Sequence, residues 1–433
     1  MYYPTMLVEF SVANYRSILA RQTLSMAASS YFKELEDLNT FDVELSERVP
    51  RLLRSTVLYG PNASGKSTLI QALEFMQDCV LHSQKESQAG DEIATVPFKL
   101  TAAARTADSE FEVTFVEQDV RYEYGFSCNN LRFTEEWLFA YPNGRAQKWF
   151  HRVFDPVADK DAYKFSASFE GDRKRQDWKA QTRGNALFLS TAIQLNNEQL
   201  KPAFGWFKNR LRVVDSASRL GPGYTVSRCK NVLDKKKIID FLNAADLSIS
   251  DLKLKESVFS LDDLPNLMPA AVKDEVAREM TGKKITEIRF VHSDLETGAP
   301  VEFEEHEESD GTRALFAFAG PWLDVTENEL VLVADELDTS LHPLLVHHLV
   351  KLLHHGGTKA QLIFTTHDTT LLSQKLLRRD QVWFMEKDET RATRLYPLSD
   401  FSPRENEAVE RGYLNGRYGG IPFLKELDFY GLG

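Results

Sequence analysis

This sequence of 433 residues is poor in cysteine and lacks both long apolar runs and a targeting leader. Its three cysteines have no paired spacing, which excludes a disulfide framework or a cysteine-rich zinc site and is typical of the reducing cytoplasm. No apolar run approaches the roughly 18 residues that span a bilayer. The opening residues MYYPTMLVEF contain no basic segment followed by an apolar core, so no signal peptide is expected. The sequence therefore predicts a cytoplasmic protein with no membrane partner.

Positive charge is also in deficit, with 52 Lys and Arg against 64 Asp and Glu and a formal net charge of −12. This balance disfavours a protein that coats nucleic acid through its overall charge, although it allows a local basic groove. Two basic runs, at 173–183 and 235–237, are candidate contacts to a phosphate backbone. Such runs more often form a solvated surface, so nucleic-acid contact stays an open alternative.

What the sequence does contain is a glycine-rich stretch at 58–68, LYGPNASGKST. The apolar residues 52–59 before it predict a buried strand, and the apolar spacing over 68–76 predicts a helix. Strand, glycine loop and helix together form the context of a phosphate-binding loop. Its backbone N–H groups would converge on phosphate oxygens, with Lys66 on the β and γ phosphates and the Ser67 hydroxyl on Mg²⁺. A glycine-rich turn that carries a lysine by chance is disfavoured because both flanks fit.

Two further apolar runs end in polar side chains suited to a nucleotide site. Residues 330–336 (LVLVADE) predict a buried strand that ends in two carboxylates at the sheet edge where ligands bind. Asp335 is placed to hold Mg²⁺ and Glu336 to polarise the attacking water, although two such acids can also be solvated turn residues. Residues 360–366 predict another buried strand, after which His367 could act as a hydrogen-bond donor at the γ-phosphate.

The remaining patterns predict an antiparallel β lobe and a second anion site. Alternating apolar residues predict β-hairpins over 111–126 and 135–153. Ser309 and Gly311, at an expected helix start, would offer a hydroxyl and free N–H groups to an anion, although this is also a common N-cap. Four histidines between 347 and 355 are interpreted as a solvated or partly packed helix face. The expected division of the chain is 1–195 (with the phosphate loop and the β lobe), 196–284 (a mostly helical insertion) and 285–433 (with the second anion site and the strand-end acids).

In order, the motifs GPNASGKST, ESDGTRALF, LVLVADELDTSLHP and TTHD resemble those of ABC-type ATPase heads of the RecF and SMC kind. The segment ANYRS near the N-terminus resembles the opening segment of those heads. The resemblance implies an α/β fold: a P-loop parallel sheet plus an antiparallel β lobe, interrupted by the insertion. It implies that ATP is bound by Arg16, Gly60, Asn62, Ala63, Ser64, Gly65, Lys66, Ser67 and Thr68.

The same resemblance assigns catalysis and the metal. It places Mg²⁺ on Ser67 and Asp335, gives catalytic roles to Glu336 and His367, and puts the D-loop at 337–343. The signature departs from the usual S-G-G-Q and reads SDGT, so contact to the γ-phosphate of a partner chain would rest on Ser309 and Gly311. Such heads pair around two ATP molecules, which implies a homodimer or a higher even-numbered oligomer. No glutamine has the flanks that would identify a Q-loop.

Residues 410–422, ERGYLNGRYGGIP, resemble the closing segment of stand-alone ATPases from bacterial anti-phage loci. These include RloA/AbiL-like proteins and the ATPase subunit of the PARIS system. The overlong-lysogenisation-defect (OLD) nucleases share a related head and carry a Toprim nuclease domain after the segment that corresponds to His367. Too few residues follow His367 here for such a domain, so a separately encoded effector, a Toprim or RloB-like nuclease, is expected.

Three functions are consistent with these features. The favoured hypothesis is an ATP-dependent sensor or switch in phage defence that holds and releases this effector. The second is a RecF-like DNA-repair or DNA-maintenance ATPase that acts directly on DNA. The third is an assembly scaffold with slow turnover, in which bound ATP stabilises an oligomer.

Overall fold

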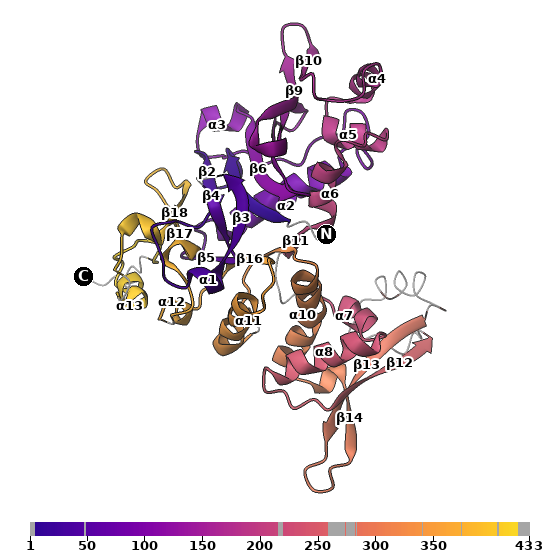
Figure 1. Ribbon diagram of the computed structural model, residues 1–433, viewed down its shortest axis with the longest axis vertical. Coiled ribbons are helices and arrows are strands. Elements are labelled where there is room, and N and C mark those ends of the chain that lie inside the picture. The colour runs from indigo at the N-terminus through magenta and orange to yellow at the C-terminus, as the bar shows by residue number, and fades with distance from the viewer. Residues whose placement is uncertain are drawn as a thin grey trace, which may run out of the picture. The chain divides into compact units, whose positions relative to one another are not determined.

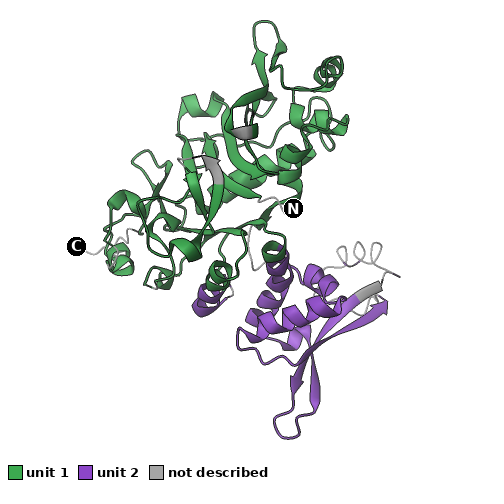
Figure 2. Cartoon of the chain, in the orientation of Figure 1, with its two compact units in different colours: residues 1–216, 325–338, 349–433 green, residues 217–324, 339–348 purple. Residues whose placement is uncertain are grey.

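A computed structural model gives the structure of this protein, and it describes residues 5–46, 49–214, 220–258, 273, 282, 284–339, 341–373, 375–404 and 407–422 (Figure 1). The chain divides into two compact units, which Figure 2 colours separately. Unit 1 comprises Met1–Ser216, Val325–Asp338 and Leu349–Gly433, and unit 2 comprises Ala217–Asp324 and Thr339–His348. Within the described ranges, no helix is both long and apolar enough to cross a membrane.

Unit 1 contains a six-stranded sheet that carries the phosphate-loop motif. The strand order is β11-β15-β16-β5-β17-β18, and neighbouring strands are parallel except for the antiparallel pair β17–β18. Every residue of β5, β15 and β16 is buried, which explains the unbroken apolar runs in the sequence. The bounds are Leu211–Val214 (β11), Val331–Ala334 (β15), Gln361–Thr365 (β16), Ser55–Tyr59 (β5), Val382–Lys387 (β17) and Thr393–Pro397 (β18).

The single strand predicted over 52–59 is wrong, because the structure divides it at Arg54. The residues before Arg54 belong to β4, which pairs with β3 in a small antiparallel sheet. The Arg54 N–H donates to the carbonyl of Asn39, at the end of the helix before β3 (2.8 Å), whereas the Arg54 carbonyl accepts from the Leu362 N–H of β16 (2.8 Å). The strand breaks where the chain changes partners. The bounds are Thr40–Ser46 (β3) and Val49–Leu53 (β4).

A seven-stranded antiparallel sheet forms the β lobe of unit 1, in the order β10-β9-β8-β7-β6-β1-β2. Both predicted hairpins are confirmed, as β6–β7 and β8–β9. Phe111, Val113 and Phe115 of β6 are buried opposite Phe126, Tyr124 and Tyr122 of β7, as the alternation requires. The bounds are Met6–Ala13 (β1), Gln22–Ser25 (β2), Ser109–Glu117 (β6), Val120–Cys128 (β7), Phe133–Tyr141 (β8), Gln147–Asp155 (β9) and Lys160–Phe165 (β10).

Helix α2 (Lys66–His82) shares one core with both sheets. Its apolar residues Leu69, Ile70, Leu73 and Met76 recur at helical spacing and are buried. They contribute to a cluster with Leu7, Phe10, Leu58 and Val333, so the helix that follows the phosphate loop is held firmly in place. The other helices of unit 1 are α1 (Glu36–Asn39), α3 (Ala102–Thr106), α4 (Lys174–Gln181), α5 (Phe188–Gln194), α6 (Lys201–Asn209), α12 (Thr370–Ser373) and α13 (Val409–Leu414), with 3-10 turns η1 (Pro142–Gly144), η5 (Arg379–Gln381) and η6 (Leu398–Phe401).

Unit 2 packs helices on a three-stranded antiparallel sheet, β12-β13-β14. Phe290 of β13 meets Phe316 of α10 edge to face, with ring centroids 5.2 Å apart. Thr225 of α7 donates to the Ala317 carbonyl and accepts from the Gly320 N–H (both 3.0 Å), which fixes α7 against α10. The bounds are Gly223–Arg228 (α7), Val232–Asn243 (α8), Asp251–Val258 (β12), Lys284–Ser293 (β13), Pro300–Glu304 (β14) and Glu305–Glu307 (η4); α10 (Asp310–Glu327) and α11 (Pro343–His355) continue into unit 1.

Residues 196–284 were expected to form a mostly helical insertion, and the structure differs from this prediction in two respects. Helix α6 and strand β11 lie in unit 1, because β11 is the outer parallel partner of β15, and unit 2 begins only at residue 217. Strand β12 also lies in this range, where Leu252 and Leu254 alternate with Lys253 and Lys255 at the strand period. Residues 215–219, 259–272, 274–281 and 283 of the range lie outside the described residues.

Candidate functional site

The phosphate-loop motif connects β5 to α2 through residues 60–65. Gly65 has φ +111°, a conformation that favours glycine, and Lys66 begins the helix. The Lys66 side chain is buried, and its Nζ donates to the carbonyls of Gly60 (2.7 Å) and Pro61 (3.3 Å). The lysine thus turns back over the loop, where its acceptors are two uncharged backbone carbonyls.

A chain of hydroxyl groups supports the loop from the side. Thr393, at the start of β18, donates to the Ser64 carbonyl (2.8 Å) and accepts from the Lys387 ammonium of β17 (2.9 Å). The Ser17 hydroxyl lies 2.8 Å from the Thr393 hydroxyl and donates to Thr68 Oγ1 (3.1 Å). Three segments distant in sequence therefore meet at the first turn of α2.

This contact also explains two glycines. A Cβ at Gly65 would lie 2.2 Å from the Thr393 hydroxyl oxygen and 2.9 Å from that of Ser17. A Cβ at Gly60 would lie 2.3 Å from the Met385 carbonyl oxygen of β17. Both glycines are needed because neighbouring strands approach the loop more closely than a side chain allows.

The acids predicted at the end of β15 meet the adjacent strand β16 through Thr365. The buried Asp335 carboxylate accepts from the Thr365 hydroxyl (2.5 Å), and Thr365 Oγ1 in turn accepts from the Glu336 N–H (2.7 Å). Glu336 has φ +47°, which is strained for a non-glycine residue, and its side chain is exposed. Thr365 therefore holds Asp335 and the Glu336 backbone in one arrangement.

The lysine of the phosphate loop and the carboxylates that follow strand β15 interact electrostatically. Burial lowers the pKa of the Lys66 ammonium below its ordinary value, while the carboxylates of Asp335, Glu336 and Asp338 act in the opposite direction. Three carboxylates near one ammonium leave an excess of negative charge that a divalent cation would neutralise. Ser64 Oγ and Asp338 Oδ1 are also buried without a hydrogen-bond partner among the described residues. The residues present therefore fit a Mg²⁺–nucleotide.

The protein offers few ligands of its own to such a cation. Among the residues that the structure describes, no group of three or more His, Cys, Asp and Glu side chains is placed to hold a metal ion. Mg²⁺ at a nucleotide site commonly takes one or two protein oxygens and completes its octahedron with phosphate and water oxygens. Ser67 and Asp335 would serve as these two protein ligands.

The structure places two other predicted residues at the edges of the loop region. His367 follows β16, its side chain is exposed, and its N–H donates to Asp338 Oδ2 (3.1 Å). Arg16 is exposed with φ +49°, and its Nε donates to the neighbouring Tyr15 hydroxyl (3.2 Å). Asn62 and Ala63 are exposed at the tip of the loop, and Ala63 is left-handed with φ +62°.

The predicted signature lies in unit 2. Ser309 precedes α10, and its Oγ accepts from the Thr312 N–H (3.1 Å), which is the geometry of an N-cap. Gly311 lies in the first turn of this helix. The D-loop range 337–343 includes residue 340, which lies outside the described residues.

Sequence reasoning missed Thr365, Thr393 and Lys387. Thr365 belongs to the TTHD motif, so its place at the end of a parallel strand was a usable signal. Thr393 and Lys387 lie on the antiparallel pair β17–β18, and nothing in their sequence spacing relates them to residues more than 300 positions earlier.

Together, the parallel sheet, the glycine loop, Lys66 and the strand-end acids define a P-loop nucleotide-binding protein of the α/β class. The chain belongs to the family described as "AAA domain, putative AbiEii toxin, Type IV TA system", whose model matches residues 55–373. No curated protein matches the chain.

Similar solved structures include the SMC head domain from Thermotoga maritima, at 13% identity over 90% of this chain and 98% of that chain, with a TM-score of 0.37. The SMC head bound to the C-winged helix domain of ScpA is similar at 11% identity over 90% and 97% of the two chains, with a TM-score of 0.39. RecF with ATP, the recombination mediator protein of the RecFOR pathway, is similar at 14% identity over 84% and 94%, with a TM-score of 0.31.

Proposed function

We propose that this protein is an ABC-type, Mg²⁺-dependent ATPase that acts as the sensor or switch subunit of a bacterial anti-phage system. The observation that carries the ATPase proposal is the convergence in unit 1 of Lys66 with Asp335, Glu336 and Asp338 beside the loop at 60–65. A buried ammonium that donates only to backbone carbonyls is ready to exchange them for phosphate oxygens.

In this proposal each residue has a distinct task. Lys66 leaves the Gly60 carbonyl and donates to the phosphates, and the loop N–H groups complete the anion site at the N-terminus of α2. Ser67 and Asp335 hold Mg²⁺, which neutralises charge on the phosphates when it is bound. Glu336 accepts a hydrogen bond from the attacking water and orients it. His367 donates to the γ-phosphate.

We further propose that the site is completed by a second chain, with Ser309 and Gly311 of one protomer facing Lys66 of the other. A mixing experiment tests this arrangement. Lys66→Ala protein and Ser309→Arg protein should each be inactive, because one loses the phosphate contact and the other blocks the signature. Their mixture should regain part of the ATPase activity, since a mixed dimer keeps one complete site. A mixture as inactive as either parent would contradict a shared site.

The defence role is supported by two independent features. The description of the family names a type IV toxin–antitoxin system. The segment at 410–422 resembles the closing segment of anti-phage ATPases, and in the structure it forms a packed cluster in which Tyr413 donates to the Gly420 carbonyl (2.8 Å) and Tyr418 stacks on Phe384. In this role the ATP cycle changes protein shape, and that change retains or releases a separately encoded nuclease.

Co-expression with the neighbouring gene tests the defence role. The partner should co-purify with this chain, and Glu336→Gln should strengthen the association because the ATP-bound state persists. Glu389→Gln is the matched control, since Glu389 is an exposed acid in the turn between β17 and β18. Nuclease activity should belong to the partner. DNA cleavage by this chain alone, or no association in any nucleotide state, would contradict the proposal.

A further inference from the structure

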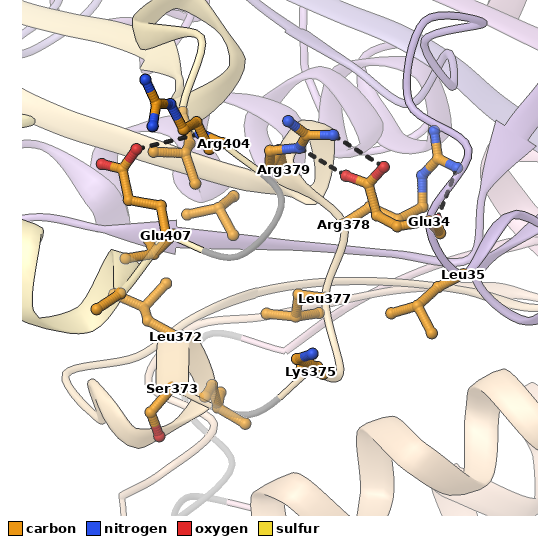
Figure 3. A pocket seen from close by; sticks show the side chains of 15 residues that line it. Glu34, Leu35, Leu372, Ser373, Lys375, Leu377, Arg378, Arg379, Arg404 and Glu407 are labelled. Atoms are coloured by element: carbon orange, nitrogen blue, oxygen red, sulfur yellow. Dashed lines mark hydrogen bonds and ion pairs between the residues drawn. The ribbon is translucent and has the colours of Figure 1, made fainter.

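Unit 1 contains a cavity of about 560 Å³ that takes no part in the nucleotide site described above. It lies among α12, η5, η6, α13 and the residues just before α1 (Figure 3). Its volume falls within the range of about 300–1,000 Å³ that is usual for small-molecule sites. Its two sides differ in chemistry, and this difference indicates what it could bind.

One side of the cavity is aliphatic. Leu35, Leu371, Leu372, Leu377 and Leu398 line it together with two valines. Leu371 and Leu398 are fully buried, whereas Leu35 and Leu377 are half-buried. Among the described residues that line the cavity, none carries an aromatic ring on which a base could stack. Such a wall suits an aliphatic chain rather than a nucleobase.

The opposite side is built from ion pairs whose charges are already balanced. Arg379 makes two hydrogen bonds to the Glu34 carboxylate (2.7 and 3.0 Å), as the dashed lines in Figure 3 mark. The buried Arg378 makes two to Asp380 (2.9 and 2.7 Å). These bidentate pairs are rigid and leave no net charge on this wall.

The second acid of the lining, Glu407, is satisfied as well, so the lining cations Lys375 and Arg404 stand outside these pairs. Glu407 accepts from the Arg404 N–H (3.1 Å) and from the Tyr418 hydroxyl, and it pairs with Arg417. The Lys375 ammonium and the Arg404 guanidinium are exposed and make no ion pair among the described residues. The cavity therefore carries a local excess of positive charge in a chain whose net charge is −12.

We propose that this cavity binds a small aliphatic carboxylate. The apolar chain would lie against Leu371, Leu372 and Leu398, and the carboxylate would lie at the rim between Lys375 and Arg404. Each buried methylene should raise the affinity about fourfold, so chain length sets the affinity and the two cations select an anion.

The cavity also has a direct connection to the nucleotide site, an extension that rests on the proposed function. Helix α12, which supplies Leu371 and Leu372, begins three residues after His367. The intervening loop is held by the Tyr59 hydroxyl, which donates to the Asp368 carbonyl (2.9 Å), and by Thr369, which donates to Glu410 of α13 (3.2 Å). A ligand that moves α12 and α13 apart or closer together would therefore move the loop that carries His367.

Calorimetric titration of the full chain with decanoate, without nucleotide, tests the site directly. Decanoate should bind with a stoichiometry of one, while acetate and decyltrimethylammonium should not, because one lacks the chain and the other reverses the charge. The double variant Lys375→Glu/Arg404→Glu should raise the dissociation constant at least tenfold. Leu377→Lys, at a half-buried position, should have a similar effect without removing a fully buried side chain.

The control is Arg145→Glu/Lys160→Glu, which makes the same charge change at exposed positions of the β lobe and should bind decanoate normally. Equal weakening in this control, or no binding by the wild type, would overturn the proposal. Binding of the peptide acetyl-Leu-Glu-Leu in place of decanoate would also overturn it, in favour of a polypeptide ligand.

ATP affinity, measured with and without decanoate, should differ about fivefold or more. An unchanged affinity would refute the connection to His367 and leave the ATPase proposal standing.

Discussion

Replacing Thr365 by valine removes one hydroxyl that connects both acids of the nucleotide site. Thr365 is fully buried, and valine has nearly the same shape, so the change deletes two hydrogen bonds with little effect on packing. The Asp335 carboxylate loses a donor at 2.5 Å and the Glu336 N–H loses an acceptor at 2.7 Å. A bond to a charged group is worth about 1.5–3 kcal/mol, and the part-buried Glu336 N–H costs less than the roughly 1–3 kcal/mol of a fully buried donor, so we expect a loss of roughly 2–4 kcal/mol.

Urea unfolding of Thr365→Val and Thr365→Ser separates the hydroxyl from the methyl group. Serine keeps the oxygen and should lose only about 1 kcal/mol, the value of one buried methyl group. Because Asp335 would no longer be held in place, Thr365→Val should also need several-fold more Mg²⁺ for half-maximal ATPase activity. Equal unfolding free energies and equal Mg²⁺ requirements for the two variants would refute the role assigned to this hydroxyl.

Three further outcomes are expected. Lys66→Ala should abolish ATP binding in a filter or fluorescence assay, whereas Lys85→Ala, in the turn that follows the C-terminal end of α2, should not. Thr393→Val should raise the dissociation constant for ATP several-fold while Thr393→Ser does not, because only the hydroxyl contacts the Ser64 carbonyl; equal effects would contradict this. Burial lowers the pKa of His354 to about 3, so the folded state resists a proton that the unfolded state takes up near pH 6.5. The stability from neutral His354 is therefore complete above pH 6.5 and falls on acidification by up to about 1.4 kcal/mol per pH unit, a slope that His354→Gln should flatten in urea unfolding.

The elements and motifs that depend on local pattern could be predicted from the sequence. The hairpins at 111–126 and 135–153 follow from strict alternation, and the β5–loop–α2 context follows from an apolar run, two glycines and helical spacing. The two acids after β15 were found for the same reason, since a buried strand leaves its first polar residues at the sheet edge.

Features that depend on tertiary contacts could not be predicted. The break at Arg54 is set by a change of partner strands, which no local pattern reveals. The histidines at 347–355 were interpreted as a solvated or partly packed helix face, which fits the structure, but the sequence could not show that His354 is the buried one, with Nε2 2.8 Å from the Ser55 hydroxyl. Thr393 reaches the phosphate loop only because β17 pairs with β5 in the folded sheet.

The amphipathic cavity illustrates the same limit. Its wall combines Glu34 and Leu35 with residues from 371 to 409, and their sequence separation hides both the ion pair Glu34–Arg379 and the shared aliphatic surface. Each leucine alone is an ordinary core residue in the sequence. Only the structure shows that, among the described residues, Lys375 and Arg404 make no ion pair at its rim.

The most direct test of the central claim is to measure ATP binding and ATP turnover on the same preparation of Glu336→Gln protein. The amide cannot accept the proton of the attacking water, whereas Lys66 and the loop that bind the nucleotide are unchanged. ATP affinity should stay within a few-fold of the wild type, and turnover should fall by about 100-fold or more, the usual contribution of a general base. Turnover at the wild-type rate would contradict the catalytic site proposed for this protein.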